Sequence, residues 1–357
     1  MATLDLLRLV AALAVVCFHY LFRGEIAADG HGLAYEYASG AAIYGYLGVH
    51  LFFLISGFVI AWSAEGREFS RFALARFARL YPGFLVCMTI SFVVLWMIAD
   101  PNLQVSIPQY IANLFMFSKA LGQPFVDGVY WSIILEIIFY GWVAIALFFG
   151  VFERWKLGLL ACWLLICAGN EFWLGNGAVK LVFITEYGAL FVSGVLIHHI
   201  YAHGRTSEAV ALLTASFFVS TASMSAGRDW MLDHYGQAVP MAGLVVSNIV
   251  IYGLLIGAVM LRSRLAPSRL VLMLGGLTYP LYLLHQNIGY LAIKGLAPVA
   301  GSWIAFAATT AVMLLLSWTI WRFIETPARR KIIASLAPFT DAISMRISRK
   351  PIPAPAE

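Results

Sequence analysis

The chain has 357 residues, of which 62% are apolar and only 11% are charged, and its mean hydropathy is +0.85. Soluble globular proteins carry about 25% charged residues, so an ordinary water-soluble enzyme, a disordered chain and a disulfide-stapled secreted module are excluded. The composition predicts an all-α polytopic membrane protein, because the apolar residues suffice for about ten spans of roughly 20 residues each.

Hydropathy windows of about 19 residues predict ten membrane-spanning helices. The first apolar run contains Arg8 and His19 and lacks the basic start and cleavage site of a signal peptide, so it is taken as the first span. The stretch 106–118 is apolar but short, and it is predicted to lie at the membrane interface. The predicted spans are 4–22, 41–63, 81–99, 129–150, 157–174, 181–200, 207–227, 241–261, 270–294 and 302–323.

The distribution of Lys and Arg predicts the orientation of these spans. With both termini in the cytoplasm, 17 of the 23 basic residues lie on the inner side, 5 lie on the outer side, and Arg8 lies within the first span. This asymmetry accounts for the net charge of +5, so no nucleic-acid partner is expected. We predict a membrane domain over residues 1–335 and a basic, Pro-rich cytoplasmic tail over residues 336–357.

Ionisable residues inside a span cost about 2.5–3.5 kcal/mol each on insertion scales, so each is a functional candidate. In the first span, Arg8 and His19 are 11 residues apart, which places them on one helix face about 16 Å apart. Asp5 precedes Arg8 by three residues and is predicted to pair with it. The alternative for Arg8 and His19 is that each side chain extends to its nearer membrane interface.

The second and fourth spans carry further polar residues. His50 lies among glycines at positions 45, 48 and 57, which permit close helix packing, and a single histidine there is more often a packing residue than a catalyst. In the fourth span, Ser132, Glu136 and Tyr140 follow one another at intervals of four residues and share one helix face. A carboxylate at that depth needs a partner or a proton, and His19 is predicted to lie at a similar depth.

The ninth span contains a third polar stripe, formed by Thr278, Tyr282 and His285. Pro280 is expected to bend this helix and to free backbone carbonyls. The stripes of the several spans are predicted to converge on a polar chamber, with His19, Glu136 and His285 towards its outer side.

The first cytoplasmic loop brings four arginines within 13 residues. The ordinary explanation is that the cytoplasmic loops of membrane proteins are enriched in Lys and Arg. The functional alternative is a site for a phosphate-bearing donor, because Arg binds phosphate oxygens bidentately. No phosphate-binding glycine motif and no metal site are predicted. The four residues are Arg67, Arg71, Arg76 and Arg79.

Six segments, in order along the chain, resemble acyltransferase family 3, the membrane enzymes that O-acylate bacterial surface glycans. Arg8 and His19 match the Arg-x10-His signature, and Arg76, Arg79 and Pro82 match Arg-x-x-Arg-[Ile/Leu]-x-Pro. The other four segments, from the second span, the fourth span, the ninth span and the chain after the tenth, read GVHLFFLISGFVI, WSIILEIIFY, TYPLYLLH and IETPARR.

The resemblance implies an acyl-CoA donor, commonly acetyl-CoA, that enters from the cytoplasm, and a carbohydrate or glycolipid hydroxyl as acceptor outside the bacterial inner membrane. No permanently bound cofactor is expected. His19 is assigned as general base or relay, Glu136 as its orienting or charge-stabilising partner, and His285 as the alternative base or oxyanion donor. The residues predicted to bind substrate are Asp5, Arg8, His50, Arg71, Arg76, Arg79, Ser132, Tyr140 and Tyr282.

Direct transfer and a covalent acyl-histidine relay are both compatible with these residues. Two other classes of protein remain as alternatives. A transporter or flippase of a glycan or lipid intermediate would explain the polar stripes but not the arginine cluster, and the chain shows no internal repeat typical of many transporters. A membrane sensor or structural protein would explain neither feature.

Overall fold

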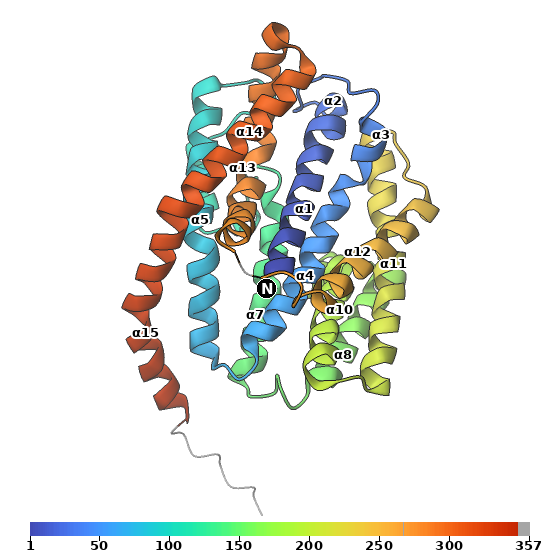
Figure 1. Cartoon of the computed structure of the whole chain (residues 1–357), viewed down its shortest axis with the longest axis vertical. Helices are drawn as coiled ribbons and strands as arrows, with labels where there is room; N and C mark the ends of the chain where they lie inside the picture. Colours follow the sequence, from blue (N-terminus) through green and yellow to red (C-terminus); the bar gives the residue numbers. More distant parts are fainter. Residues whose placement is uncertain (267, 349–357) are drawn as a thin grey trace, which may run out of the picture.

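The computed structural model describes residues 1–266 and 268–348, and within them the chain is all-α, with no strand. The long helices run roughly parallel to one another and alternate in direction, with α15 leaning along α5 at one side of the bundle (Figure 1). The helices are α1 (Ala2–Phe18), α2 (Gly24–Ile26), α3 (Ser39–Ala42), α4 (Gly48–Ala64), α5 (Phe69–Ile98), α6 (Ile107–Leu114), α7 (Tyr130–Phe148), α8 (Lys156–Gly169), α9 (Gly177–Phe183), α10 (Thr185–His203), α11 (Ser207–Tyr235), α12 (Met241–Met260), α13 (Arg269–Ala300), α14 (Ser302–Ile320) and α15 (Thr326–Ser348).

Several long helices continue through a turn of different pitch. Three turns are π-helical, η1 (His19–Arg23), η4 (Asn170–Leu174) and η5 (Trp321–Glu325), and two are 3₁₀-helical, η2 (Ile43–Leu47) and η3 (Ser118–Leu121). Turns of the π type occur mostly as single insertions and often at functional sites. Here η1 begins at His19 and η5 ends at Glu325, so two of the three π-helical turns contain a residue of the candidate site or its surroundings.

Within the described residues, nine helical segments are long and apolar enough to cross a membrane. They correspond to nine of the ten predicted spans. The remaining predicted span, 270–294, lies within α13, whose 32 residues would reach about 48 Å. Its central residues from Leu277 to Tyr290 are buried and include several polar side chains, which lower its apolar character. The protein is therefore an all-α polytopic membrane protein, with nine of the ten predicted spans found among the described residues.

The close packing predicted from the second-span glycines is confirmed. A Cβ at Gly45 would lie 2.1 Å from the Ala14 carbonyl oxygen of α1, and one at Gly48 would lie 2.5 Å from that of Ala11. Further along α4, a Cβ at Gly57 would lie 2.2 Å from the Phe191 oxygen of α10. Any larger side chain would push these backbones apart, so α4 is fixed between α1 and α10.

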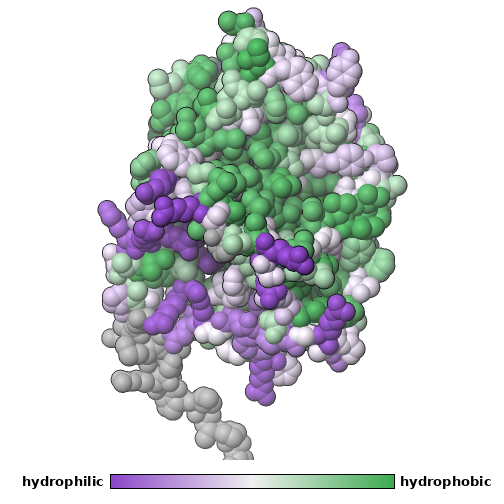
Figure 2. Space-filling view, in the orientation of Figure 1, coloured by the Kyte–Doolittle hydropathy of each residue, from purple (hydrophilic) through white to green (hydrophobic). Residues whose placement is uncertain are grey.

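The outer surface follows the expected division between lipid and water. Apolar side chains cover most of the face shown in Figure 2, whereas hydrophilic side chains gather towards the end from which the chain leaves the bundle. The predicted interfacial stretch forms α6, which begins with a capping box between Ser106 and Gln109. The side chains of Ile107, Ile111 and Phe115 are 48%, 52% and 67% exposed, as an interfacial helix requires.

The predicted domain boundary after residue 335 falls inside α15, which continues to Ser348. The hydroxyl of Ser70, near the start of α5, donates to the Thr340 carbonyl oxygen at 3.2 Å, so α15 packs against the bundle beyond that boundary. Residues 349–357, the Pro-rich end of the predicted tail, lie outside the described residues.

The orientation leads to a labelling prediction. Tyr37, in the loop between α2 and α3, is 94% exposed, and Arg67, between α4 and α5, is also exposed at the opposite end of α4. We expect a membrane-impermeant maleimide to label Tyr37→Cys in intact spheroplasts of a bacterial host, and to label Arg67→Cys only after the membrane is opened. Labelling of Arg67→Cys in intact spheroplasts would contradict the orientation derived from the basic residues.

Candidate active site

The predicted polar stripes converge on one cavity between α1, α4, α5, α7 and α13. Its empty volume, including its open side, is about 780 Å³. We call this cavity the polar chamber. Its polar lining consists of Arg8, Ser56, Arg76, Arg79, Ser132, Glu136, Tyr140, Thr278, Tyr279 and Tyr282. The convergence inferred from helical spacing is therefore confirmed, and seven of the residues predicted to touch substrate or to act on it line one space.

The arginines of the chamber differ in their partners. Arg8 Nη1 lies 3.5 Å from Asp5 Oδ1, which confirms the predicted pair one helical turn apart. Arg79 forms an ion pair with Glu325, a carboxylate that is 2% exposed. The guanidinium of Arg76 lies over the rings of Phe72 and Tyr140, at 5.8 Å from each centroid.

Arg76 differs from the other two arginines of the chamber, because no carboxylate among the described residues pairs with it. Within residues 1–266 and 268–348 its Nε atom is buried and has no hydrogen-bond partner. A guanidinium has five N–H donors in a fixed fork, and leaving them unsatisfied away from water is costly. Arg76 therefore offers a ready contact for an anion in the chamber. Arg71, one turn earlier on α5, is exposed and is not part of the chamber lining described here.

Glu136 lies in the chamber, but it does not pair with His19 as the sequence suggested. Its Oε1 accepts hydrogen bonds from the hydroxyls of Ser56, at 2.7 Å, and of Tyr140. Neither histidine hydrogen-bonds to it among the described residues. The predicted pairing was wrong because helical spacing fixes the face of a residue but not the height of one helix relative to another.

The two predicted histidines do lie together. The ring centroids of His19, in η1, and His285, in α13, are 4.9 Å apart, and the side chains are 8% and 0% exposed. His285 Nδ1 lies 2.8 Å from the Tyr282 carbonyl oxygen, which can only accept, so Nδ1 carries the proton of the neutral ring. Its Nε2 then holds a lone pair, and this buried atom has no partner within the described part of the chain.

Tyr282 connects the polar chamber with the histidines. Its hydroxyl lies 2.7 Å from Ser132 Oγ of α7 and donates to the Val129 carbonyl oxygen at 3.3 Å. Tyr282 belongs to the chamber lining, and its ring centroid lies 5.7 Å from that of His285. The two histidines were expected at the outer side of the chamber, but neither is among the residues that line it.

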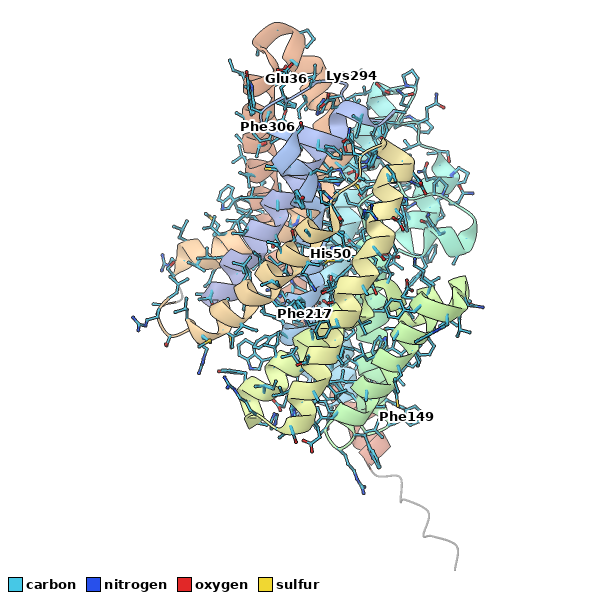
Figure 3. The ribbon with its side chains drawn as sticks, turned by 90° about the vertical axis from the view of Figure 1, so that its right-hand side faces the viewer. Glu36, His50, Phe149, Phe217, Lys294 and Phe306 are labelled. Carbon is cyan, nitrogen blue, oxygen red and sulfur yellow. The ribbon has the colours of Figure 1, made fainter. Side chains whose placement is uncertain are left out.

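His50 lies inside the bundle (Figure 3), but it is not a member of the described chamber lining. Its ring meets Tyr46 at 5.9 Å and Tyr187 at 5.4 Å between centroids, both edge-on. These contacts favour the packing alternative raised from the sequence, in which a lone histidine fills space between helices. The prediction that it binds substrate remains a prediction.

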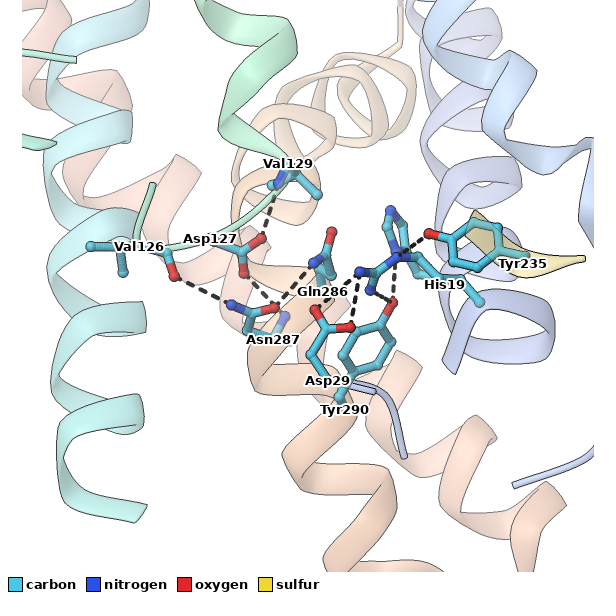
Figure 4. Close-up of polar contacts among 10 residues, drawn as sticks. His19, Asp29, Val126, Asp127, Val129, Tyr235, Gln286, Asn287 and Tyr290 are labelled. Atoms are coloured by element: carbon cyan, nitrogen blue, oxygen red, sulfur yellow. Dashed lines mark hydrogen bonds and ion pairs between the residues drawn. The ribbon is translucent and has the colours of Figure 1, made fainter. Parts of the chain in front are cut away.

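A second polar network lies on the outer side of His19 and includes residues that sequence reasoning did not single out (Figure 4). Arg23, in the same π-helical turn, donates Nη2 to both carboxylate oxygens of Asp29, at 2.9 and 3.0 Å. It also donates to the hydroxyls of Tyr290 and Tyr235. The signal available in the sequence was the position of Arg23, four residues after His19, but it was counted only as an outer-side charge.

Glu325 was also missed, although it lies in the closing IETPARR segment. That segment was used only for its resemblance, because an acidic residue after the last span is ordinary in a cytoplasmic segment. The π-helical turn η5 instead buries the carboxylate between α5 and α15. A mid-helix change of pitch is not visible in hydropathy, so this burial could not be predicted from the sequence.

Asp127 fastens the start of α7 to α13. Its carboxylate oxygens accept the backbone N–H groups of Val129, at 3.2 Å, and of Asn287, at 3.0 Å. In return, Asn287 Nδ2 donates to the Val126 carbonyl oxygen at 3.2 Å (Figure 4). This reciprocal contact fixes the helix that carries Glu136 against the helix that carries His285.

Comparison with known proteins identifies an acyltransferase family. A family model described as an acyltransferase domain matches residues 1–322. The acyltransferase MdmB of Streptomyces mycarofaciens is 32% identical to the chain over 141 residues, which cover 38% of this chain and 36% of that protein. The chain thus matches only about a third of this relative's length. No solved structure matches the chain significantly.

Asp127 gives a prediction about pH. Burial raises the pKa of this carboxyl from 3.8 to about 6, although its two backbone N–H partners act in the opposite direction. The folded state then binds more protons than the unfolded state between these pH values. The carboxyl's contribution to stability is therefore greatest below pH 3.8 and is lost as the pH rises through about 6.

We expect the Tm of the wild type, minus that of Asp127→Asn, to fall as the pH rises from about 4 to 7. Thermal unfolding of the two detergent-purified proteins, followed by tryptophan fluorescence, measures this difference. A difference that stays constant or grows over this range would show that Asp127 is not protonated on burial.

Proposed function

The chain belongs to acyltransferase family 3, and from this premise we propose that this multi-pass membrane protein is an acyl-CoA-dependent O-acyltransferase. The donor, in our proposal acetyl-CoA, enters from the cytoplasm, and the acceptor is a hydroxyl of an extracytoplasmic glycan or glycolipid. The membrane is the bacterial inner membrane, since the basic residues favour an inner side that holds both termini.

The observation that carries this proposal is the chamber containing Arg8, Arg76 and Arg79. The cations come from two helices, and Arg76 has no carboxylate partner among the described residues. A phosphate-bearing donor supplies oxygens that match a guanidinium bidentately. A transporter would have no specific need for this arrangement.

The remaining charges of the chamber have supporting roles in this proposal. Asp5 holds Arg8 at the entrance, and Glu325 holds Arg79 against α15. Glu136, bonded to Ser56 and Tyr140, balances the positive charge of the chamber rather than orienting His19. Arg71, exposed at the edge of the basic side, attracts the donor without touching it in the chamber.

The chemistry takes place beside His19. In our proposal the acceptor oxygen attacks the thioester carbonyl carbon, His19 takes the hydroxyl proton, a C–O bond forms and the C–S bond breaks. The proton then passes to the departing sulfur, so CoA leaves as the thiol. His19 is the better placed base because it is 8% exposed, whereas His285 is fully buried. His285 lies against it and provides a second imidazole beside the reacting atoms.

Removal of Arg76 tests the donor site. Arg76→Ala should weaken acyl-CoA binding about 10- to 150-fold, because each hydrogen bond to a charged group contributes about 1.5–3 kcal/mol. Binding of labelled acyl-CoA to the purified protein measures the effect. Arg67→Ala removes the same charge from the same arginine cluster, but Arg67 lies outside the chamber lining, so this variant should bind the donor nearly as the wild type does. Equal losses of donor affinity in the two variants would show that the arginine cluster serves only to orient the protein in the membrane.

Substitution of His19 tests the base. His19→Gln keeps a hydrogen-bonding side chain but cannot take a proton, and it should lower turnover about 10²- to 10⁴-fold. Acceptor-dependent release of free CoA measures turnover, and donor affinity should remain near that of the wild type. Glu136→Gln should reduce turnover less, since Glu136 has no contact with the base. Full activity in a correctly inserted His19→Gln protein would show that His19 is not the base and would leave His285 as the candidate.

A further inference from the structure

Arg23 joins three separate segments at the outer end of the bundle. Its guanidinium donates to Tyr235 at the end of α11, at 2.7 Å, and to Tyr290 in α13, at 2.8 Å. Its Nη2 donates to both carboxylate oxygens of Asp29, in the loop after α2. With Nε, Nη1 and Nη2 all engaged, this side chain has little freedom to move.

Tyr290 is the one of these partners that also reaches His19. Its oxygen lies 2.8 Å from His19 Nδ1 and 2.8 Å from Arg23 Nη1, and its side chain is 1% exposed. Figure 4 shows the phenol of Tyr290 close to both His19 and Asp29. A continuous chain of contacts therefore runs from Asp29 through Arg23 and Tyr290 to the imidazole.

We propose that Tyr290 is a positioning residue, held by Arg23, that fixes the ring orientation and the tautomer of His19. This inference rests on the proposed function, in which His19 takes a proton from the acceptor. A phenol oxygen has two acceptor positions, so it can receive Nη1–H of Arg23 and Nδ1–H of His19 at once. In that arrangement the lone pair of His19 is on Nε2.

The geometry explains why an arginine stands at this place. Arg can only donate, so its bond to Tyr290 always occupies one acceptor position of the phenol oxygen and holds the ring in place. Asp29 neutralises the cation and anchors it to the outer loop. The other groups that face His19 are His285, across the ring contact, and Phe18, edge-on at 5.2 Å. Tyr290 is therefore the side chain seen to bond to His19 within the described part of the chain.

The two tyrosines provide a matched pair of variants. Tyr290→Phe and Tyr235→Phe each remove one phenol oxygen that accepts from Arg23, but only the first removes the bond to His19. We expect Tyr290→Phe to lower turnover up to about 10²-fold, since small misplacements of a catalytic group have effects of that size. The KM for acyl-CoA should not change. Tyr235→Phe should retain turnover close to that of the wild type.

A double substitution separates positioning from general support of the fold. Combined with His19→Gln, Tyr290→Phe should cause no further loss, because the residue on which it acts has gone. Similar losses in Tyr290→Phe and Tyr235→Phe, or the same fractional loss in the His19→Gln background, would overturn the proposal.

A readout that needs no turnover distinguishes this inference from the proposed function. In ¹⁵N-histidine-labelled protein, the resonances absent from His19→Gln belong to His19, and their chemical shifts report which ring nitrogen carries the proton. We expect a protonated Nδ1 in the wild type and in Tyr235→Phe, and a mixture of tautomers in Tyr290→Phe. An unprotonated Nδ1 in the wild type would overturn the proposal, even if Tyr290→Phe failed to fold. If the spectra are as expected but the protein transfers no acyl group, the positioning role of Tyr290 stands and the proposed function is refuted.

Discussion

Arg79 of α5 and Glu325 of η5 form an ion pair between two helices of a membrane-spanning bundle, and the carboxylate is 2% exposed. An ion that is buried without a partner is costly, so such a charge is retained only with a partner or in a polar space. Removing one member of a buried pair leaves the other uncompensated, at a cost of about 3–5 kcal/mol. The pair therefore fixes α15 against α5, and with it one wall of the polar chamber. Arg8 with Asp5 and Glu136 with its two hydroxyl donors meet the same requirement on the other walls.

The part of the site that follows from helical periodicity was predictable from the sequence. Ser132, Glu136 and Tyr140 had to share a face, and so did Thr278 and Tyr282, because both sets repeat at the period of the helix. A stripe of this kind cannot face lipid, so the stripes had to meet inside the bundle. The glycines of the second span had to lie at close helix contacts for a similar reason, since they offer no side chain to lipid or to a packed core.

The part that depends on relative heights and on local pitch was not predictable. Glu136 was expected beside His19, but α7 and α1 are displaced such that the carboxylate meets Ser56 and Tyr140 instead. The turn η1 changes the pitch just where His19 and Arg23 lie, and the loop after α2 then brings Asp29 to Arg23. No pattern in a single sequence specifies which loop residue returns to which helix. The same applies to Asp127, whose bond to the backbone of Asn287 spans 160 residues.

The separation between arginines and histidines constrains how any transfer must proceed. The lining of the chamber includes its arginines and Tyr282 but neither His19 nor His285, and the ring centroid of Tyr282 lies 5.7 Å from that of His285. On the proposed function, the phosphates of the donor remain with the arginines, so the acyl carbonyl has to reach from the chamber to the histidines. The hydrogen bond between Tyr282 and Ser132 joins α13 to α7 beside His285. His19 is held by other contacts, because its Nδ1 bonds to Tyr290 and Arg23 donates to the same phenol oxygen. A base held in this way is compatible both with direct transfer and with an acyl-histidine relay, so the choice between the two depends on how the donor carbonyl approaches His19 and not on how His19 is held.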